Sequence, residues 1–429
     1  MTQIQNLRTL IELAQSQGAK YSEVYQVSSL SRPVFFEGNR LKQIENSQAQ
    51  GTALRIWYEG RPGVAVAYGK FDPQLLVQKA IAISQLNSPE IAQLAPTRTQ
   101  IIPNQDRSIE TKDLIELGQK AIAKIREHYP ETICSAELDC ETENTTLINS
   151  QGLNCRYTET SLSYFLGVEL VKGDDFLGVY DGETSKNTLN CDRVVENILT
   201  HLDWSKTNVA SPQGKVPVLL TANAATLLWD LVASALNGKR VGEKSSPWSD
   251  CLGKTIANPK ITICQNPSLS PYNSPFDDEG VPTQELKFIE DGILKKFYCD
   301  LTSAQELQIA STGNGFRNDL GSYPQPSLIN LVINPGESSF EELISQLDNG
   351  IIIDQFLGGG ADISGDFSLN VELGYRVSNG EIVGRIKDTA VSGNIYQILK
   401  GDITLGNAPL WNGSCKTPSV LVTGFSVTS

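Results

Sequence analysis

The first 70 residues change from a helical to an extended hydrophobic pattern. Apolar side chains first recur every three or four positions, which predicts an amphipathic helix ending near Gly18; they are Leu7, Leu10, Ile11 and Ala14. From Tyr21 to Gly69 the period shortens to two, as along Thr52 to Tyr58. This alternation predicts a meander of antiparallel strands.

The following segments predict helices separated by further strands. Asp72 and Pro73 suit a helix start, and that helix runs to about Leu86. Further helices are expected from about Thr111 to Tyr129 and from Cys191 to Leu202. The strands expected between them are 133–139, 145–149 and 153–171.

The second half opens with one strand and one helix and then becomes mostly extended. Strand 216–220 leads into a helix from about Asn223 to Asn237, and Ser338 to Glu341 reads as a capping box before a short helix. Asp291-Gly292 and Asn379-Gly380 are hairpin turns. The expected strands are 281–289, 293–299, 351–356, 367–378, 381–386 and 419–427.

These patterns predict an α/β (α+β) protein of two domains. A chain of 429 residues can fill two cores. We expect a mixed α/β domain over residues 1–204, a polar linker over 205–215 and a mainly antiparallel β domain over 216–429.

Composition narrows the possible partners and location. The net charge is −14 and the sequence pI is about 4.8, which argues against direct nucleic acid binding because phosphate contacts need clustered Lys and Arg. Up to Gln17 there is no secretion signal, and no apolar run approaches the ~18 residues of a membrane span. We therefore expect a cytoplasmic protein, with its eight cysteines as free thiols.

Histidine is too scarce for the usual hydrolytic sites. His128 and His201 are the only two, and both fall near predicted helix ends, where a cation is favoured. A histidine-activated nucleophile or a histidine-based zinc site is therefore not expected in this chain.

Three other motifs favour ordinary structural roles. Gly358-Gly359-Gly360 matches neither common phosphate-binding glycine pattern, so we interpret it as a turn between strands or a point of close backbone approach. Asp277-Asp278-Glu279 and the pair Asp362 and Asp366 could bind a cation, but lack further oxygen ligands at suitable spacing. Solvated loops are the favoured interpretation for both.

Several short stretches together carry a resemblance to a known family. The most specific is Ser274-Pro275-Phe276-Asp277-Asp278-Glu279-Gly280-Val281, and weaker ones are Gly18-Ala19, 149–153, 290–294, 311–313 and 365–368. With the helix at Leu227 to Gly238, they make the whole chain resemble the TldD/PmbA family, in particular its TldE (PmbA) branch. The resemblance implies the two-domain TldD/PmbA fold.

The resemblance also implies a missing metal site. TldD subunits carry H-E-x-x-x-H on the corresponding helix and a cysteine close to the C-terminus. This chain has Trp229, Asp230 and Ser234 at the three positions, and Cys415 near that of the cysteine. An indole cannot bind zinc, which takes imidazole, thiolate or carboxylate ligands. We therefore expect no cofactor in this chain, and zinc in a TldD-like partner.

The leading hypothesis is a non-catalytic TldE-like subunit of a cytosolic metalloprotease that acts on unfolded or small peptides. Asp277, Asp278, Glu279, Asp362, Asp366 and Cys415 are its possible cleft or partner contacts. Peptides held as added β-strands would suit a sheet-rich cavity, and a cleft without an exposed strand edge would contradict that mode. The alternatives are a homodimeric peptide-binding or scaffold protein, an indirect modulator of DNA gyrase, and an unrecognised hydrolase using Asp230 or the acidic run at 277–279.

Overall fold

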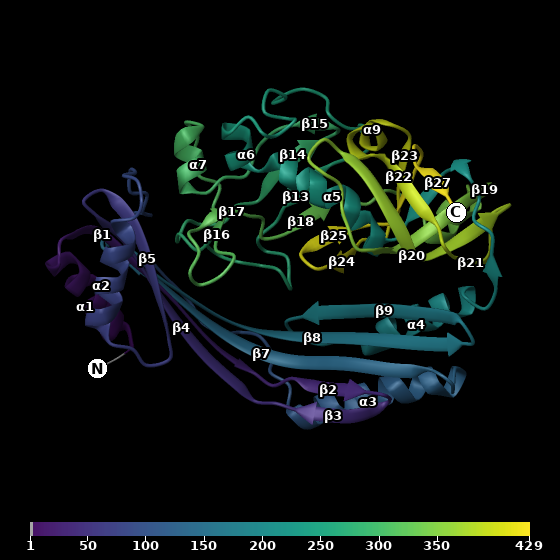
Figure 1. The fold of residues 1–429 in the computed structure, drawn as a ribbon, viewed down its shortest axis with the longest axis horizontal. Coiled ribbons are helices and arrows are strands. Elements are labelled where there is room, and N and C mark those ends of the chain that lie inside the picture. Colours follow the sequence, from purple (N-terminus) through teal and green to yellow (C-terminus); the bar gives the residue numbers. More distant parts are fainter. Residues whose placement is uncertain (1–2) are drawn as a thin grey trace.

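The computed structural model describes residues 3–429, and its N-terminal part is built on one long sheet (Figure 1). The strands of this sheet run in the order β3-β2-β7-β1-β4-β5, with β8 on the other side of β7 and β6 and β9 beside β8. Their bounds are β1 Ala19–Ser31, β2 Val34–Glu37, β3 Arg40–Ile44, β4 Ser47–Tyr58, β5 Arg61–Tyr68, β6 Thr99–Ile102, β7 Ile133–Asn149, β8 Asn154–Lys172 and β9 Asp175–Ser185.

Helices cover this sheet at its two ends. α1 (Gln3–Ser16) and α2 (Pro73–Ser84) enclose one core with β1, β4 and β5. α3 (Thr111–His128) and α4 (Cys191–Trp204) enclose a second core at the far ends of β7 and β8. Asp72 caps α2 with its side chain, as its sequence predicts.

Two sequence predictions for this sheet are wrong in detail. The strands do not form a simple meander, because both edges of β1 are occupied by β4 and β7, and the β2–β3 hairpin pairs with β7 instead. The two strands expected between Ile133 and Asn149 are one strand, because the polar stretch in its middle still pairs with β1 and β8.

The C-terminal part has two larger sheets and a small hairpin. The ten-stranded sheet holds β10 Asn208–Val209, β11 Gly214–Lys215, β12 Val218–Leu220, β19 Asn349–Leu357, β20 Asp366–Ser378, β21 Glu381–Ile386, β22 Ala390–Asn394, β23 Ile403–Leu405, β26 Val420–Val422 and β27 Ser426–Thr428. The six-stranded sheet holds β13 Ile263–Gln265, β14 Leu286–Glu290, β15 Ile293–Leu294, β18 Leu331–Ile333, β24 Leu410–Asn412 and β25 Cys415–Thr417. The hairpin is β16 Gly315–Phe316 with β17 Gln325–Pro326.

Helix α5 (Ala222–Leu236) lies between these two sheets and contacts β12 and β19 on one side and β24 and β25 on the other. Most of its side chains are buried, as expected of a helix that is apolar on nearly every face. The shorter helices are α6 Gly238–Gly242, α7 Leu301–Glu306, α8 Phe340–Ser345 and α9 Ile395–Lys400.

Two local expectations shift in this part. The capping box is formed by Ser339 and Glu342, one residue later than expected, because Ser339 occupies the cap position. The last predicted strand is divided into β26 and β27 by a bend at Gly424, whose φ of 104° ends the extended run.

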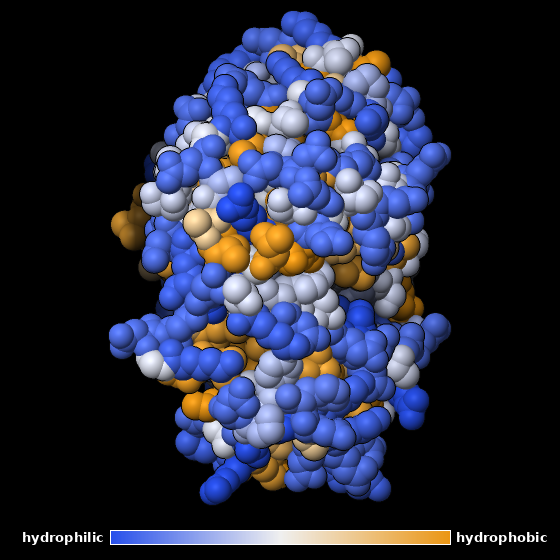
Figure 2. Space-filling view, turned by 90° about the vertical axis from the view of Figure 1, so that its right-hand side faces the viewer, coloured by the Kyte–Doolittle hydropathy of each residue, from blue (hydrophilic) through white to orange (hydrophobic). Residues whose placement is uncertain are grey.

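The two parts share one hydrophobic core beside α4. Val194, Val195 and Ile198 of α4 belong to the same buried cluster as Ile352 and Tyr375 of the ten-stranded sheet. Figure 2 shows a mostly hydrophilic face with separate patches of hydrophobic side chains near its middle. Among the described helices, none combines the length and apolar character that crossing a membrane requires.

Candidate functional site

A cavity of about 970 Å³, here the first cavity, lies between the two parts of the molecule. Its N-terminal wall comes from β8, β9 and α4, including Phe165, Tyr180 and Trp204. Its C-terminal wall comes from α8 and the segments around β24, including Phe340 and Trp411. Aromatic side chains from both parts therefore face one interdomain space.

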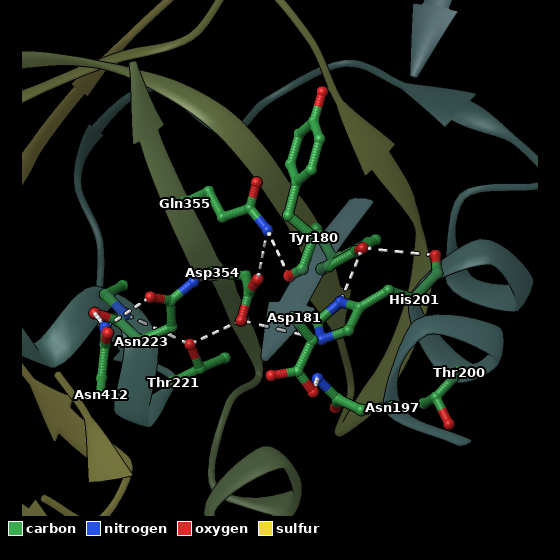
Figure 3. Close-up of polar contacts among 12 residues, drawn as sticks. Tyr180, Asp181, Asn197, Thr200, His201, Thr221, Asn223, Asp354, Gln355 and Asn412 are labelled. Atoms are coloured by element: carbon green, nitrogen blue, oxygen red, sulfur yellow. Dashed lines mark hydrogen bonds and ion pairs between the residues drawn. The ribbon is translucent and has the colours of Figure 1, made fainter. Parts of the chain in front are cut away.

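A buried polar network lies where α4 meets β19 (Figure 3). The carboxylate of Asp354 accepts hydrogen bonds from Thr221 Oγ1 at 2.7 Å and Gln355 Nε2 at 3.2 Å. His201 Nε2 lies 3.7 Å from the same carboxylate, and its Nδ1 is 2.9 Å from the hydroxyl of Tyr375. The network joins helix α4 to the ten-stranded sheet. The hydroxyl of Thr221 bonds to the carboxylate of Asp354 and not to the imidazole of His201, so Thr221 and His201 do not form a nucleophile–base pair.

The free edge of β9 borders the first cavity. Among the strands of residues 3–429, β9 pairs only with β8, and its residues 180–184 line the cavity. Side chains satisfy part of this edge, because the carbonyls of Tyr180 and Gly182 accept from Gln355 at 3.3 Å and Arg193 at 2.8 Å. Such side-chain cover is one way in which proteins protect an unpaired strand. The structure thus has the cleft-facing strand edge that peptide addition requires.

A second cavity of about 520 Å³ adjoins the first and shares Asn223, Asp354 and Gln355 with it. Asp230 and Ser234 of α5 line it, as do Glu372 and the glycine turn 358–360. The turn connects β19 to β20, so a strand and not a helix follows it, as the sequence indicates. Two of the three positions that the resemblance aligns with the TldD metal motif therefore line a cavity.

The third position, Trp229, belongs to the core. Its side chain is fully buried, and its indole N–H donates to Thr417 Oγ1 at 2.7 Å. Asp230 is solvent-accessible, and its partial desolvation in the recess raises the pKa of its carboxyl group.

The donors beside α5 do not fit a zinc ion. Cys415 is a buried thiol whose pKa is raised to about 12 by desolvation and by the nearby charge of Asp230. Among residues 3–429, no three His, Cys, Asp or Glu side chains form a group that could hold a metal. Asp230 and Cys415 are two donors, short of the three protein ligands of a catalytic zinc.

The solvated-loop interpretation of Asp277-Asp278-Glu279 is wrong. Asp277 and Glu279 are 0% and 1% exposed, and none of the three lines either cavity. Asp277 accepts hydrogen bonds from the backbone N–H groups of Glu279, Val281 and Gly315. These donors fold the loop around the Asp277 side chain and favour its charged form, whereas burial raises the pKa of Asp277 above its ordinary value.

This acidic loop belongs to an ion-pair network between the two parts. Glu23 of β1, whose side chain is 0% exposed, pairs with Arg55 of β4 at 3.1 Å and with Arg317 at 2.8 Å. The backbone N–H of Arg317 donates to Asp278. The corner between the N-terminal sheet and the C-terminal part is therefore held by buried charges.

The remaining candidate residues from the sequence lie outside the two cavities or have structural surroundings. Asp362 and Asp366 are exposed, and both accept hydrogen bonds from Ser364 within their loop. His128 and His201 lie in the last turns of α3 and α4, as expected, and all eight cysteines are free. Sequence reasoning missed Asp354, Thr221 and the charges around Glu23, because each is an isolated residue whose partner is distant in the chain.

We predict that replacing Glu143 by Gln makes the chain relatively more stable at alkaline pH. Burial and the charges of Glu159 and Glu141 raise the pKa of Glu143 to about 7. The folded chain therefore binds this proton more tightly than the unfolded chain, and the stability it contributes at low pH is lost as the pH rises through about 7. Urea unfolding at pH 5 and pH 8 should show the wild type losing on the order of 2 kcal/mol more than Glu143→Gln between those pH values. Equal losses would contradict the prediction.

The fold and the cavities define a two-domain α+β protein whose candidate site is an interdomain cleft, with no imidazole on the central helix. Its C-terminal part, residues 213–429, matches the model of the PmbA/TldA metallopeptidase C-terminal domain, and residues 22–84 match domain 1 of the same family. The chain belongs to the TldD/PmbA family.

Individual relatives agree with this assignment. The chain is 30% identical over 231 residues to the metalloprotease TldD homolog of Haemophilus influenzae, covering 53% of this chain and 47% of the relative. It therefore spans less than half the length of that relative. TldE from Thermococcus kodakarensis superposes with a TM-score of 0.90 at 22% identity over 99% of this chain and 100% of that one. A putative modulator of a DNA gyrase from Thermotoga maritima gives 0.88 at 24% over 100% of both. At these identities the two structures establish the fold alone.

Proposed function

We propose that this chain is a non-metal-binding, TldE-like subunit of a metalloprotease that cleaves unfolded or small peptides. The observation that carries the proposal is the construction of α5. A core tryptophan takes the place of the first metal-motif histidine, and the donors left beside the helix do not suit zinc. The metal and the glutamate base would come from a TldD-like partner, and this chain would supply binding surface.

We propose that the peptide binds in the first cavity. A space of about 970 Å³ between aromatic walls has the size and character of a ligand site. The edge of β9 could add one peptide strand after Gln355 and Arg193 release the carbonyls they cover. Main-chain hydrogen bonds of this kind place few demands on sequence, which suits unfolded substrates.

The test is cleavage of an unstructured peptide by the purified chain, by a TldD-like partner and by their mixture, with zinc quantified in each. Only the mixture should cleave efficiently, chelation should abolish the activity, and the zinc should accompany the partner. Replacing Asp230 by Asn in this chain should leave the rate unchanged. Peptides methylated at alternate backbone nitrogens should be poor substrates if strand addition operates. Cleavage by this chain alone, or loss of activity in Asp230→Asn, would refute the subunit role.

A homodimeric peptide-binding protein is the second candidate, because this chain alone lines a cavity of about 970 Å³. It predicts saturable peptide binding by the isolated chain, with no gain in cleavage on adding a metalloprotease. Indirect modulation of gyrase and an independent hydrolase are weaker candidates, since no feature in the part of the chain that the structure describes favours either.

A further inference from the structure

Two aromatic rings lie flat on the N-terminal wall of the first cavity. Phe165 of β8 and Tyr180 of β9 are stacked, with ring centroids 6.1 Å apart and an interplanar angle of 13°. Gly167 is directly opposite Tyr180, and a Cβ there would lie 2.9 Å from the tyrosine ring. A Cβ on Gly178 would lie 2.7 Å from the tyrosine oxygen. Glycine in these two strands therefore makes room for the tyrosine ring to lie against the sheet.

The stacked pair is open to solvent and surrounded by acidic side chains. Phe165 is 46% exposed, and Glu137 of β7 is its cross-strand neighbour. Burial and the charges of Glu169 and Glu372 raise the pKa of Tyr180, so carboxylates from both parts of the molecule act on this ring. Within the described chain, Glu137, Glu169 and Glu372 form no ion pair. Their negative charge is uncompensated.

The same chain shows what such surroundings bind. The ammonium group of Lys186 lies 5.4 Å from the ring centroid of Tyr157 and 2.5 Å from the carboxylate of Glu159, two residues at the other end of β8. On the opposite wall of the first cavity, Lys416 lies 5.6 Å from the ring of Trp411. No Lys or Arg of residues 3–429 is placed in this way over Phe165 or Tyr180.

We propose that Phe165, Tyr180 and Glu137, which line the first cavity, bind the cationic side chain of a lysine or arginine in a peptide held there, while Glu169 and Glu372 add negative charge from outside that lining. The inference rests on the proposed peptide-binding function and adds to it a preference for basic substrates. The faces of the rings attract the cation, the carboxylates neutralise it, and the flat ring surface accepts its aliphatic stem.

The test is binding of two fluorescent, unstructured peptides that differ only in one central residue, Lys or Gln, measured by anisotropy with the purified full-length chain at low salt. The Lys peptide should bind about tenfold more tightly, a ratio within reach of one cation–π contact and nearby carboxylates. Phe165→Leu keeps the apolar cover but removes the ring, and Glu137→Gln removes one charge. Each should reduce the ratio severalfold. Glu116→Gln, the same charge change on α3 at the other face of the sheet, should leave it intact.

Equal binding of the two peptides, or equal effects of Glu137→Gln and Glu116→Gln, would overturn the inference. A Phe165→Leu variant that keeps the Lys preference but associates less well with a TldD-like partner would also overturn it, by making the rings a protein interface. Cleavage of the Lys and Gln peptides at equal rates by the mixed subunits would refute the basic preference and leave the proposed function standing. Lys-selective binding without any cleavage by the mixture would refute the proposed protease function and leave the preference for basic peptides standing.

Discussion

Replacing Glu23 by Gln is expected to lower the free energy of unfolding by about 3–5 kcal/mol, the usual cost of removing one partner from a buried ion pair. Glu23 is the carboxylate that two guanidinium groups share, at 3.1 Å from Arg55 and 2.8 Å from Arg317. All three side chains are at most 7% exposed. Without the charge of Glu23, two desolvated cations would face each other across the junction of the two parts.

Chemical denaturation of the variant at neutral pH measures this loss. Glu37→Gln is the matched control, because its partner Lys42 lies at the surface and both side chains are more than half exposed. An exposed pair of this kind contributes roughly 0–1 kcal/mol. A loss no greater than that of Glu37→Gln would mean that Asp278 and Glu279 already compensate both arginines, and that Glu23 is not the centre of the network.

The elements that the sequence predicted well are those with strong local signals. Asp72-Pro73 begins α2, and Asn379-Gly380 forms the turn between β20 and β21 with φ angles of 52° and 76°. The central helix also follows its pattern, since α5 spans Ala222–Leu236 close to the expected range. Each of these depends on interactions within a few residues, which a linear sequence displays directly.

What could not be predicted depends on contacts between distant residues. Arg317 and Glu23 are separated by 294 positions, and Asp354 meets His201 only because β19 packs beside α4. Asp277-Asp278-Glu279 illustrates the difficulty most clearly. A run of three acidic residues ordinarily indicates solvent exposure, and nothing local reveals that the backbone N–H groups of Gly315 and Arg317 will bind it.

For Trp229, Asp230 and Ser234, the sequence indicated the helix but not the direction in which each side chain points. The resemblance aligns the three positions with α5, and the structure separates them by the face of the helix on which they lie. Asp230 and Ser234 point to the second cavity, while Trp229 packs among the side chains of the C-terminal core. Trp229 therefore stabilises the C-terminal core, at a position where its indole could not bind a metal.

This division predicts that Trp229→Ala is strongly destabilising, whereas Ser234→Ala is nearly neutral. Removing a fully buried indole leaves a large cavity between the two C-terminal sheets and costs about 3–5 kcal/mol. It also removes the 2.7 Å hydrogen bond to Thr417. Ser234, half-buried at the cavity, should change the free energy of unfolding by no more than about 0.5 kcal/mol. Urea denaturation of both variants and of Trp229→Phe, which keeps most of the ring volume, would rank the three. If Trp229→Ala were as mild as Ser234→Ala, the indole would not be a core residue, and position 229 would be free to take part in a site.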